Sequence, residues 1–259
     1  MLTGIVAGFG EPLGTDRLAA LRARGFRLIR QDLQTGQGRH PQTDAVLAEG
    51  AAWTAQGGQM LYIVDGTTLG RVPAGAWVEV LNEPEYLSPA DYALLLHKVW
   101  PTVLTLRLTV WAGSIGNTDA DSLLWLQRVL QAAPMVTHVA VHRYSPEANQ
   151  DRTKAHKGFG SRDGELRWLR DIIGPRPYLV SEVGYHSAWR RTWWFWRTRL
   201  SWDEQARRVM QELDYWRAHG AEACCVYQEN DAPGATADQW GVRDARGVWK
   251  TGTGYGPVW

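Results

Sequence analysis

The sequence predicts an α/β fold, a closed (β/α)8 barrel (TIM barrel) formed as a single domain by residues 1–259. Short apolar runs recur along the chain, and amphipathic segments separate most of them, a pattern typical of a parallel sheet. Eight repeats favour a closed barrel over an open doubly wound sheet, because no glycine-rich phosphate fingerprint follows the first run. The runs cover residues 4–9, 26–32, 59–65, 77–83, 107–113, 138–144, 178–184 and 223–229.

Helix-start signals support this alternation. They are Thr15-Asp16, Thr43-Asp44, Ser88, Asp119, Ser161 and the capping box of Ser201 with Glu204. Two segments lack such support. Residues 66–75 are too short and too rich in breakers for a helix, and the chain after residue 229 has no helical periodicity. The third and eighth helices are therefore predicted to be reduced or absent.

Composition and charge exclude several classes of protein. The chain has 28 Lys and Arg against 27 Asp and Glu, so no overall field would attract nucleic acid or an anionic membrane. No apolar run approaches the roughly 20 residues of a spanning helix. The N-terminus shows no positively charged leader. We expect a soluble monomer, cytoplasmic or secreted after loss of a signal.

The cysteines and histidines give no sign of a disulfide, a metal or a cofactor. Cys224 and Cys225 are adjacent in an apolar run, so they should point to opposite faces of a strand as buried small hydrophobes. The histidines do not occur with carboxylates at metal-ligand spacing. Neither a metal nor a cofactor is therefore expected.

Two glutamates stand at the ends of apolar runs. Glu83 ends the fourth run and Glu182 lies near the end of the seventh, 99 positions later (182 minus 83). All strands of a parallel barrel end at one face, so these side chains should meet at its mouth. Alternation along the strands points both side chains inward. Glu83 should share its strand face with Glu79 and Leu81, and Glu182 should share its face with Tyr178 and Val180. An acid and a base across one pocket break glycosidic bonds, so the pair predicts sugar chemistry.

Five segments carry a resemblance that covers essentially the whole chain. They are Arg30, residues 77–84 (WVEVLNEP), His142-Arg143-Tyr144, residues 181–184 (SEVG) and residues 241–250. In this order they are similar to motifs of the clan A glycoside hydrolases, a superfamily of retaining glycosidases that includes the cellulase-like family 5 and the xylosidase-like family 39. The resemblance implies a TIM-barrel glycosidase that needs no cofactor.

The resemblance also implies roles for individual residues. Asn82 would bind a sugar 2-hydroxyl, Glu83 would be the acid/base and Glu182 the nucleophile. The Tyr144 hydroxyl would hydrogen-bond the nucleophile, which Arg30 would keep ionised. These neighbours should lower the pKa of Glu182, whereas a like charge and poorer solvation should raise the pKa of Glu83. The two carboxyl groups are expected about 5–5.5 Å apart, with retention of configuration.

Several other residues are candidates for substrate binding. Trp111, at the end of the fifth run, is the candidate platform on which a sugar ring would stack. His142 and Tyr144 would contact substrate or be hydrogen-bonded interior residues. Tyr227 and Gln228 stand where the clan has the aromatic floor of its central subsite.

Two further features have open interpretations. Glu79 should be buried below the acid/base and pair with Arg107 or Arg30. The insertion at residues 185–199, rich in Trp and Arg, follows the nucleophile and would overhang the site. It would form a subsite wall or pack over the barrel rim, and its arginines could attract an acidic glycan or only solvate the loop.

The favoured function is a retaining β-glycosidase that acts on an oligosaccharide or polysaccharide, with no nucleic-acid or membrane partner. A catalytically silent sugar-binding barrel is one alternative, but it would typically have lost one of the two glutamates. A barrel enzyme for phosphorylated metabolites is another, but it would need a glycine-rich phosphate cradle after the seventh and eighth strands. The tryptophan-rich insertion occupies that place.

Overall fold

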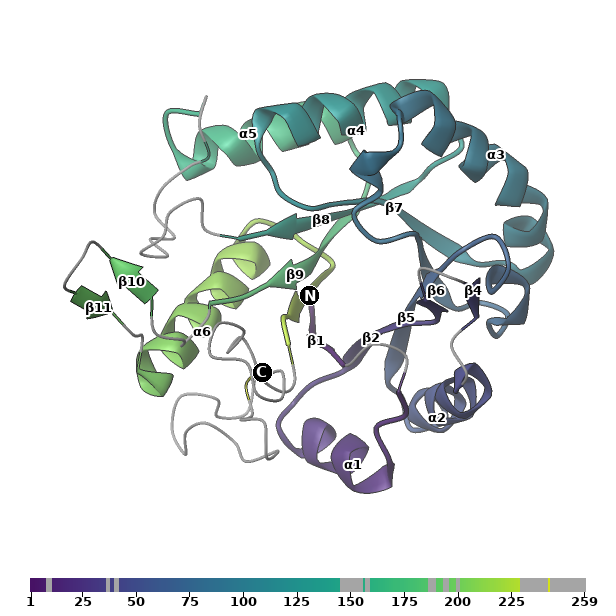
Figure 1. Cartoon of the computed structure of the whole chain (residues 1–259), viewed down its shortest axis with the longest axis horizontal. Coiled ribbons are helices and arrows are strands. Elements are labelled where there is room, and N and C mark those ends of the chain that lie inside the picture. Colours follow the sequence, from purple (N-terminus) through teal and green to yellow (C-terminus); the bar gives the residue numbers. More distant parts are fainter. Residues whose placement is uncertain are drawn as a thin grey trace.

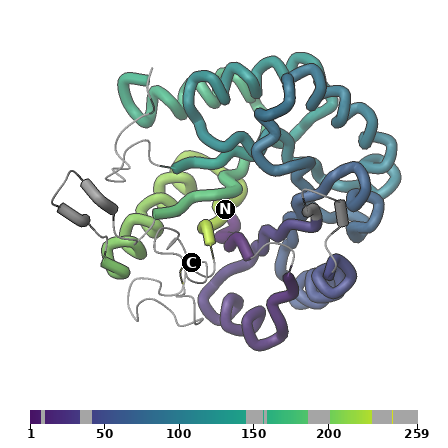
Figure 2. The backbone as a smooth tube through the Cα atoms, in the orientation of Figure 1, coloured from purple at the N-terminus to yellow at the C-terminus, as the bar shows by residue number. Residues whose placement is uncertain are grey.

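A computed structural model describes residues 1–7, 11–35, 38–39, 42–144, 156, 159–185, 190–192, 196–198, 201–228 and 242. Eight parallel strands close into a barrel in the order β1-β12-β9-β8-β7-β6-β5-β2 (Figure 1). The barrel closes where β1 pairs with β12, so the first and last strands lie side by side (Figure 2). The predicted (β/α)8 fold is therefore confirmed. The strands are β1 (Leu2–Val6), β2 (Leu28–Asp32), β5 (Gln59–Val64), β6 (Trp77–Val80), β7 (Thr109–Ile115), β8 (His138–Arg143), β9 (Tyr178–Val183) and β12 (Ala223–Val226).

Six α-helices of the described chain surround the barrel (Figure 1). They are α1 (Thr15–Ala23), α2 (Thr43–Ala55), α3 (Pro89–Leu106), α4 (Ala120–Ala132), α5 (Arg162–Ile173) and α6 (Trp202–Ala218). In the last four, the predicted caps Ser88, Asp119, Ser161 and Ser201 each accept a hydrogen bond from the backbone N–H three residues later. Thr15 and Thr43 are instead the first helical residues of α1 and α2.

The prediction that the third helix is reduced or absent is confirmed. Between β5 and β6 the chain forms only the 3-10 turn η1 (Leu69–Arg71). Asp65 organises this turn, because its Oδ1 accepts hydrogen bonds from the backbone N–H groups of Thr67 at 2.8 Å and Thr68 at 2.9 Å. The predicted absence of an eighth helix falls after residue 228 and lies outside the described residues, as does most of the 241–250 motif.

Alternation along the strands separates two hydrophobic clusters. The larger fills the space between strands and helices. The smaller, which we call the apolar layer, fills the barrel interior and consists of Val6, Leu28, Leu61, Trp111, Ala140, Leu179, Ala223 and Cys225. Cys224 belongs to the first cluster and Cys225 to the second, and both are buried free thiols, as predicted.

Shorter elements complete the described chain. They are the strand pair β3 (Gln34–Thr35) and β4 (Gly38–Arg39), the 3-10 turn η2 (Pro84–Tyr86), and the antiparallel pair β10 (Arg190–Thr192) and β11 (Trp196–Thr198). The last pair lies in the insertion at 185–199, whose tryptophan and arginine side chains lie outside the described part of the structure. Within that part, no helix has the length and apolar character needed to cross a membrane.

Candidate active site

Arg30, on β2, is the centre of a polar layer above the apolar layer. Its guanidinium is 1% exposed and donates to Glu182 Oε1 at 2.7 Å, Glu79 Oε2 at 2.8 Å and Asn82 Oδ1 at 2.7 Å. Burial alone would lower the Arg30 pKa, but the charges of Glu79 and Glu182 raise it above its ordinary value. Arg30 is thus the predicted partner of Glu79, while Arg107 is an exposed residue at the end of α3.

Glu182 points into the barrel for a reason that simple alternation does not predict. Tyr178 and Val180 pack in the outer cluster, so alternation from them would turn Glu182 outward. A β-bulge reverses this, because Val141 of β8 pairs with Val180 while His142 pairs with Glu182. The expectation that Glu182 shares the face of Tyr178 and Val180 was therefore wrong, although its inward direction was right.

Glu83 reaches the same place through an irregular backbone. Strand β6 ends at Val80, and Leu81 and Glu83 both adopt positive φ values, 66° and 46°. Leu81 packs on the outer cluster, away from the inward face of Glu79, so the predicted shared face was wrong here too. The Glu83 N–H donates to the carbonyl of Ser114, a residue at positive φ where β7 has its own register shift. Such strained conformations are concentrated at functional sites.

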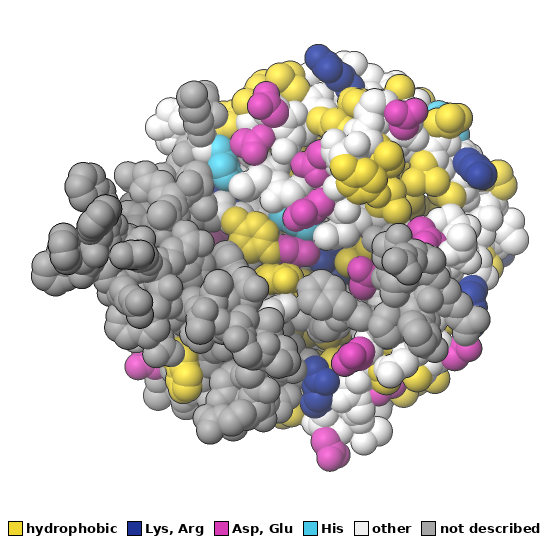
Figure 3. All heavy atoms as spheres, viewed as in Figure 1, with side chains coloured by type: hydrophobic (Ala, Val, Ile, Leu, Met, Phe, Trp, Pro, Cys, Tyr) yellow, Lys and Arg dark blue, Asp and Glu magenta, His cyan; other side chains and the backbone are white. Residues whose placement is uncertain are grey.

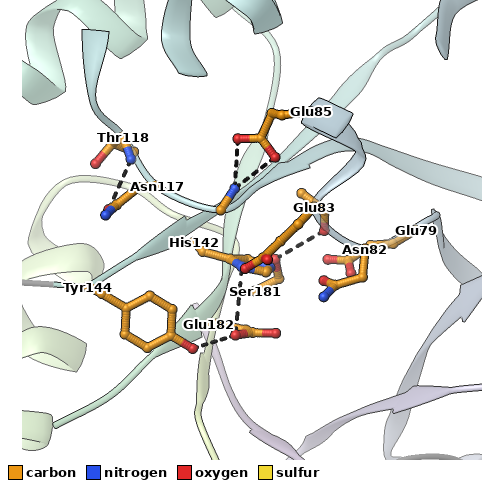
Figure 4. A network of polar contacts seen from close by, with 12 residues as sticks. Glu79, Asn82, Glu83, Glu85, Asn117, Thr118, His142, Tyr144, Ser181 and Glu182 are labelled. Carbon is orange, nitrogen blue, oxygen red and sulfur yellow. Dashed lines mark hydrogen bonds and ion pairs between the residues drawn. The ribbon is translucent and has the colours of Figure 1, made fainter. Parts of the chain in front are cut away.

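His142 lies between the two glutamates (Figure 4). Its Nδ1 is 3.1 Å from Glu83 Oε1 and 3.6 Å from Glu182 Oε2, and its Nε2 is 3.4 Å from the Arg30 Nη2. Arginine can only donate, so Nε2 is the acceptor and the ring proton lies on Nδ1, from which it is donated to Glu83. His142 therefore links the charge of Arg30 to the carboxylate of Glu83.

The pKa of Glu83 differs from the sequence expectation. We expected a like charge and poor solvation to raise it. Instead, the hydrogen bond from His142 lowers the pKa, outweighing the opposing effect of burial. The Glu83 side chain is 50% exposed, so its desolvation is incomplete. Acidic side chains lie in a hollow near the middle of this face (Figure 3).

Tyr144 follows β8 and donates its hydroxyl to Glu182 Oε2 (Figure 4). Burial, followed by the charge of Glu182, raises the Tyr144 pKa well above its ordinary value, so the hydroxyl remains a donor. The ring of Tyr227 meets the Tyr144 ring edge-on, with centroids 6.2 Å apart. Gln228 is buried, and its backbone carbonyl accepts from the Val242 N–H at 2.9 Å.

Four residues expected to bind substrate are buried, namely Arg30, Trp111, His142 and Gln228. Trp111 has no exposed surface and packs inside the apolar layer against Trp77, with ring centroids 4.9 Å apart. The platform prediction was wrong because β7 continues to Ile115, which places Trp111 near the strand's beginning. Arg30 and His142 are 1% and 0% exposed. Arg30 donates to Glu182, and His142 lies beside both Glu83 and Glu182.

One metal-like cluster occurs at this site. Single ligand atoms of Glu83, His142 and Glu182 all lie within 4.8 Å of one another, a spacing that could hold a metal ion. The sequence expectation of no such cluster was wrong, because the three residues come from separate parts of the chain. Arg30 donates to both Glu182 and His142, and its fixed positive charge opposes a second cation. The residues therefore fit a hydrogen-bond network better than a metal site.

Sequence reasoning missed several residues that shape the site. Ser114 and Ser181 lie at the register shifts of β7 and β9, and their hydroxyls are 3.5 Å apart. Glu85, two residues after Glu83, accepts hydrogen bonds from the Gly116 N–H (Figure 4). Glu85 could have been found from the sequence, because it directly follows the Asn-Glu-Pro motif. No sequence pattern predicts the register shifts of β7 and β9.

Comparisons with known proteins agree with the fold. No protein-family model and no curated protein sequence matches the chain. A GH5-4 broad specificity endoglucanase from Clostridium acetobutylicum superposes with a TM-score of 0.63 at 13% identity, covering 93% of this chain and 88% of that one. A family 1 β-glucosidase from Thermotoga maritima gives 0.57 at 10% identity, covering 92% and 83%. A GH128 exo-β-1,3-glucanase from Aureobasidium namibiae gives 0.52 at 11%, covering 96% and 82%.

These superpositions show a shared fold, the TIM barrel found in several glycoside hydrolases.

Proposed function

We propose that the protein is a retaining β-glycosidase that hydrolyses an oligosaccharide or polysaccharide. The observation that carries this proposal is the meeting of two carboxylates with different surroundings: oxygens of Glu83 and Glu182 lie within 4.8 Å of each other. One oxygen of each group within this limit supports the short separation of retaining enzymes, roughly 5–5.5 Å between carboxyl groups, against the roughly 6.5–9.5 Å of inverting enzymes.

In the first step, a Glu182 oxygen attacks the anomeric carbon while Glu83 gives its proton to the leaving glycosidic oxygen. The carbon–oxygen bond to the leaving group breaks, and an ester to Glu182 forms. Arg30 and Tyr144 each hold one oxygen of the nucleophile, which fixes its orientation and stabilises its charge before attack. In the second step, Glu83 takes a proton from water, which attacks the same carbon and frees Glu182.

Glu83 must be protonated for the first step, although His142 lowers its pKa in the free protein. A sugar bound in the hollow would displace water from the half-exposed Glu83 and favour its neutral form. Once the ester has formed, the charge of Glu182 is gone, and the hydrogen bond from His142 favours the carboxylate that the second step needs. The same histidine therefore suits the base role of Glu83.

The two alternatives have less support. A silent sugar-binding barrel does not need two glutamates brought together, with one held by Arg30 and Tyr144 and the other by His142. A phosphate-handling barrel would need a cluster of donors for the anion, whereas Glu79, Glu83 and Glu182 give this site an excess of negative charge over Arg30.

The test is release of phenol from a panel of aryl β-glycosides, together with reducing-end release from polysaccharides. Wild type should hydrolyse at least one substrate, and Glu182→Gln should lower kcat/KM by on the order of 10³–10⁴-fold. Glu222→Gln is the matched control, since Glu222 is exposed and directly precedes β12 at the opposite end of the barrel. Inactive wild type, or equal activity in both variants, would reject the proposal.

A further inference from the structure

We infer that Glu85 is a positioning residue that holds the loop at Gly116 against the carboxyl group of Glu83. This inference rests on the proposed function, because it assigns Glu85 a role in setting the acid/base. It concerns a carboxylate that the two-glutamate mechanism does not use.

Glu85 lies on η2, the 3-10 turn that directly follows Glu83. The Gly116 N–H donates to Glu85 Oε1 at 3.0 Å and to Oε2 at 3.1 Å, and the Ser122 side chain adds a hydrogen bond to the same carboxylate. Gly116 precedes α4 and Ser122 lies in its first turn. Glu85 thus joins the turn that carries Glu83 to the whole β7–α4 connection.

Gly116 forms one wall around the Glu83 carboxyl group. A Cβ added at Gly116 would lie 3.2 Å from Glu83 Cδ and 3.3 Å from Glu83 Oε1, which is tighter than ordinary contact. The same Oε1 accepts the hydrogen bond from His142. The Glu83 carboxyl therefore has both the His142 imidazole and Gly116 as close neighbours. In Figure 4 the backbone bonded to Glu85 runs between the Glu85 and Glu83 carboxylates.

Such support matters because two features of Glu83 leave its position dependent on its neighbours. Its side chain is half-exposed, and its backbone is held at φ 46°, a conformation that persists only when neighbours enforce it. A shift of about 1 Å in a catalytic group can cost on the order of 10²-fold in rate. Burial raises the Glu85 pKa, and the hydrogen bonds from Ser122 and from the Gly116 N–H oppose this rise.

The test compares Glu85→Ala with Glu85→Gln on aryl glycosides whose leaving groups range from dinitrophenol to unactivated phenol. Protonation by Glu83 matters only for the poor leaving groups. Glu85→Ala should therefore lower kcat for unactivated phenol by about 10–100-fold and for dinitrophenol by much less. Glu85→Gln keeps an oxygen for the Gly116 N–H and should retain most activity. Gly116→Ala, which displaces Glu83 directly, should reproduce the pattern of Glu85→Ala.

Equal losses on both classes of leaving group, or no loss in Glu85→Ala, would overturn the inference while leaving the proposed function intact. A second measurement needs no substrate. The amide hydrogen of Gly116 should exchange faster in Glu85→Ala than in wild type and Glu85→Gln, and equal exchange in all three would contradict the clamp. Wild type that hydrolyses nothing would instead remove the proposed function.

Discussion

The barrel interior contains two neighbouring layers built by the same strands and with opposite chemistry. On β2, Leu28 belongs to the apolar layer and Arg30, two residues later, to the polar one. On β8, Ala140 and His142 are related in the same way. The apolar layer follows strict alternation, which keeps one face of each strand buried. The polar layer departs from it at the residues that we propose to carry the chemistry.

Those departures have an energetic meaning. The apolar layer stabilises the fold by removing large side chains such as Trp111 from water. The polar layer includes a register shift before Glu182 and positive φ angles at Glu83 and Ser114, each a locally unfavourable feature. The comparison indicates that the regular packing of the apolar layer stabilises the irregular backbone of the polar layer, where the directions of a few side chains matter most.

The largest effect should come from removing the cation of the polar layer. Arg30→Met would leave Glu79 and Glu182 buried without their partner, which should lower the free energy of unfolding by about 3–5 kcal/mol in urea titrations. The control is Arg207→Met, whose ion pair with Glu204 lies on the surface and should contribute little. Equal midpoints for the two variants would mean that the polar layer does not depend on Arg30.

Trp111→Leu tests the apolar layer. The cavity should lower the free energy of unfolding by about 2–3 kcal/mol, less than a full truncation to alanine. The KM of the folded fraction should stay unchanged, because Trp111 lies below the polar layer. A raised KM with unchanged stability would restore the interpretation of Trp111 as a sugar platform.

His142→Phe should change the pH profile. Loss of the Nδ1 donor removes the main cause that lowers the Glu83 pKa, so that pKa should rise. Glu83 would then remain protonated to higher pH, and the basic limb of kcat/KM should move upward. His97→Phe, on the exposed face of α3, is the control and should leave the limb in place. A downward shift in His142→Phe would refute the proposed hydrogen bond.

The smallest effect on stability is expected from a surface ion pair, that of Glu204, which serves as a reference for the buried polar layer. Hydrogen bonds from Arg207 and Arg208 lower the Glu204 pKa from 4.5 to about 2. A lowered folded-state pKa stabilises the protein above pH 4.5, and this contribution is lost as the pH falls toward 2. Any Tm difference between wild type and Glu204→Gln should therefore shrink over that window. A difference that grows on acidification would contradict the assignment.

The sequence was sufficient for the architecture because it depends on repeated local patterns. Eight apolar runs, four side-chain caps and a breaker-rich third connection all appear as expected. It also predicted that Glu83 and Glu182 lie close together, since strand ends in a parallel barrel converge. These features follow from periodicity and from capping chemistry, which a single sequence displays.

The features that the sequence did not predict depend on the register between neighbouring strands. One extra residue in β9 turns Glu182 inward, and an extension of β7 buries Trp111, yet neither leaves a local signal. The pKa of Glu83 was mispredicted for a related reason. Its direction depends on His142, whose distance from Glu83 is set by two separate strands.

The most direct test of the account is the anomeric configuration of the first product, followed by proton NMR during hydrolysis of a β-glycoside. Glu83 and Glu182 have oxygens within 4.8 Å of each other, a short distance that favours direct attack by Glu182 over attack by a water molecule. Direct attack followed by hydrolysis retains the configuration, so the β-anomer should appear first and only later mutarotate. Initial appearance of the α-anomer would mean that water attacks directly, and the double displacement assigned to Glu83 and Glu182 would be wrong.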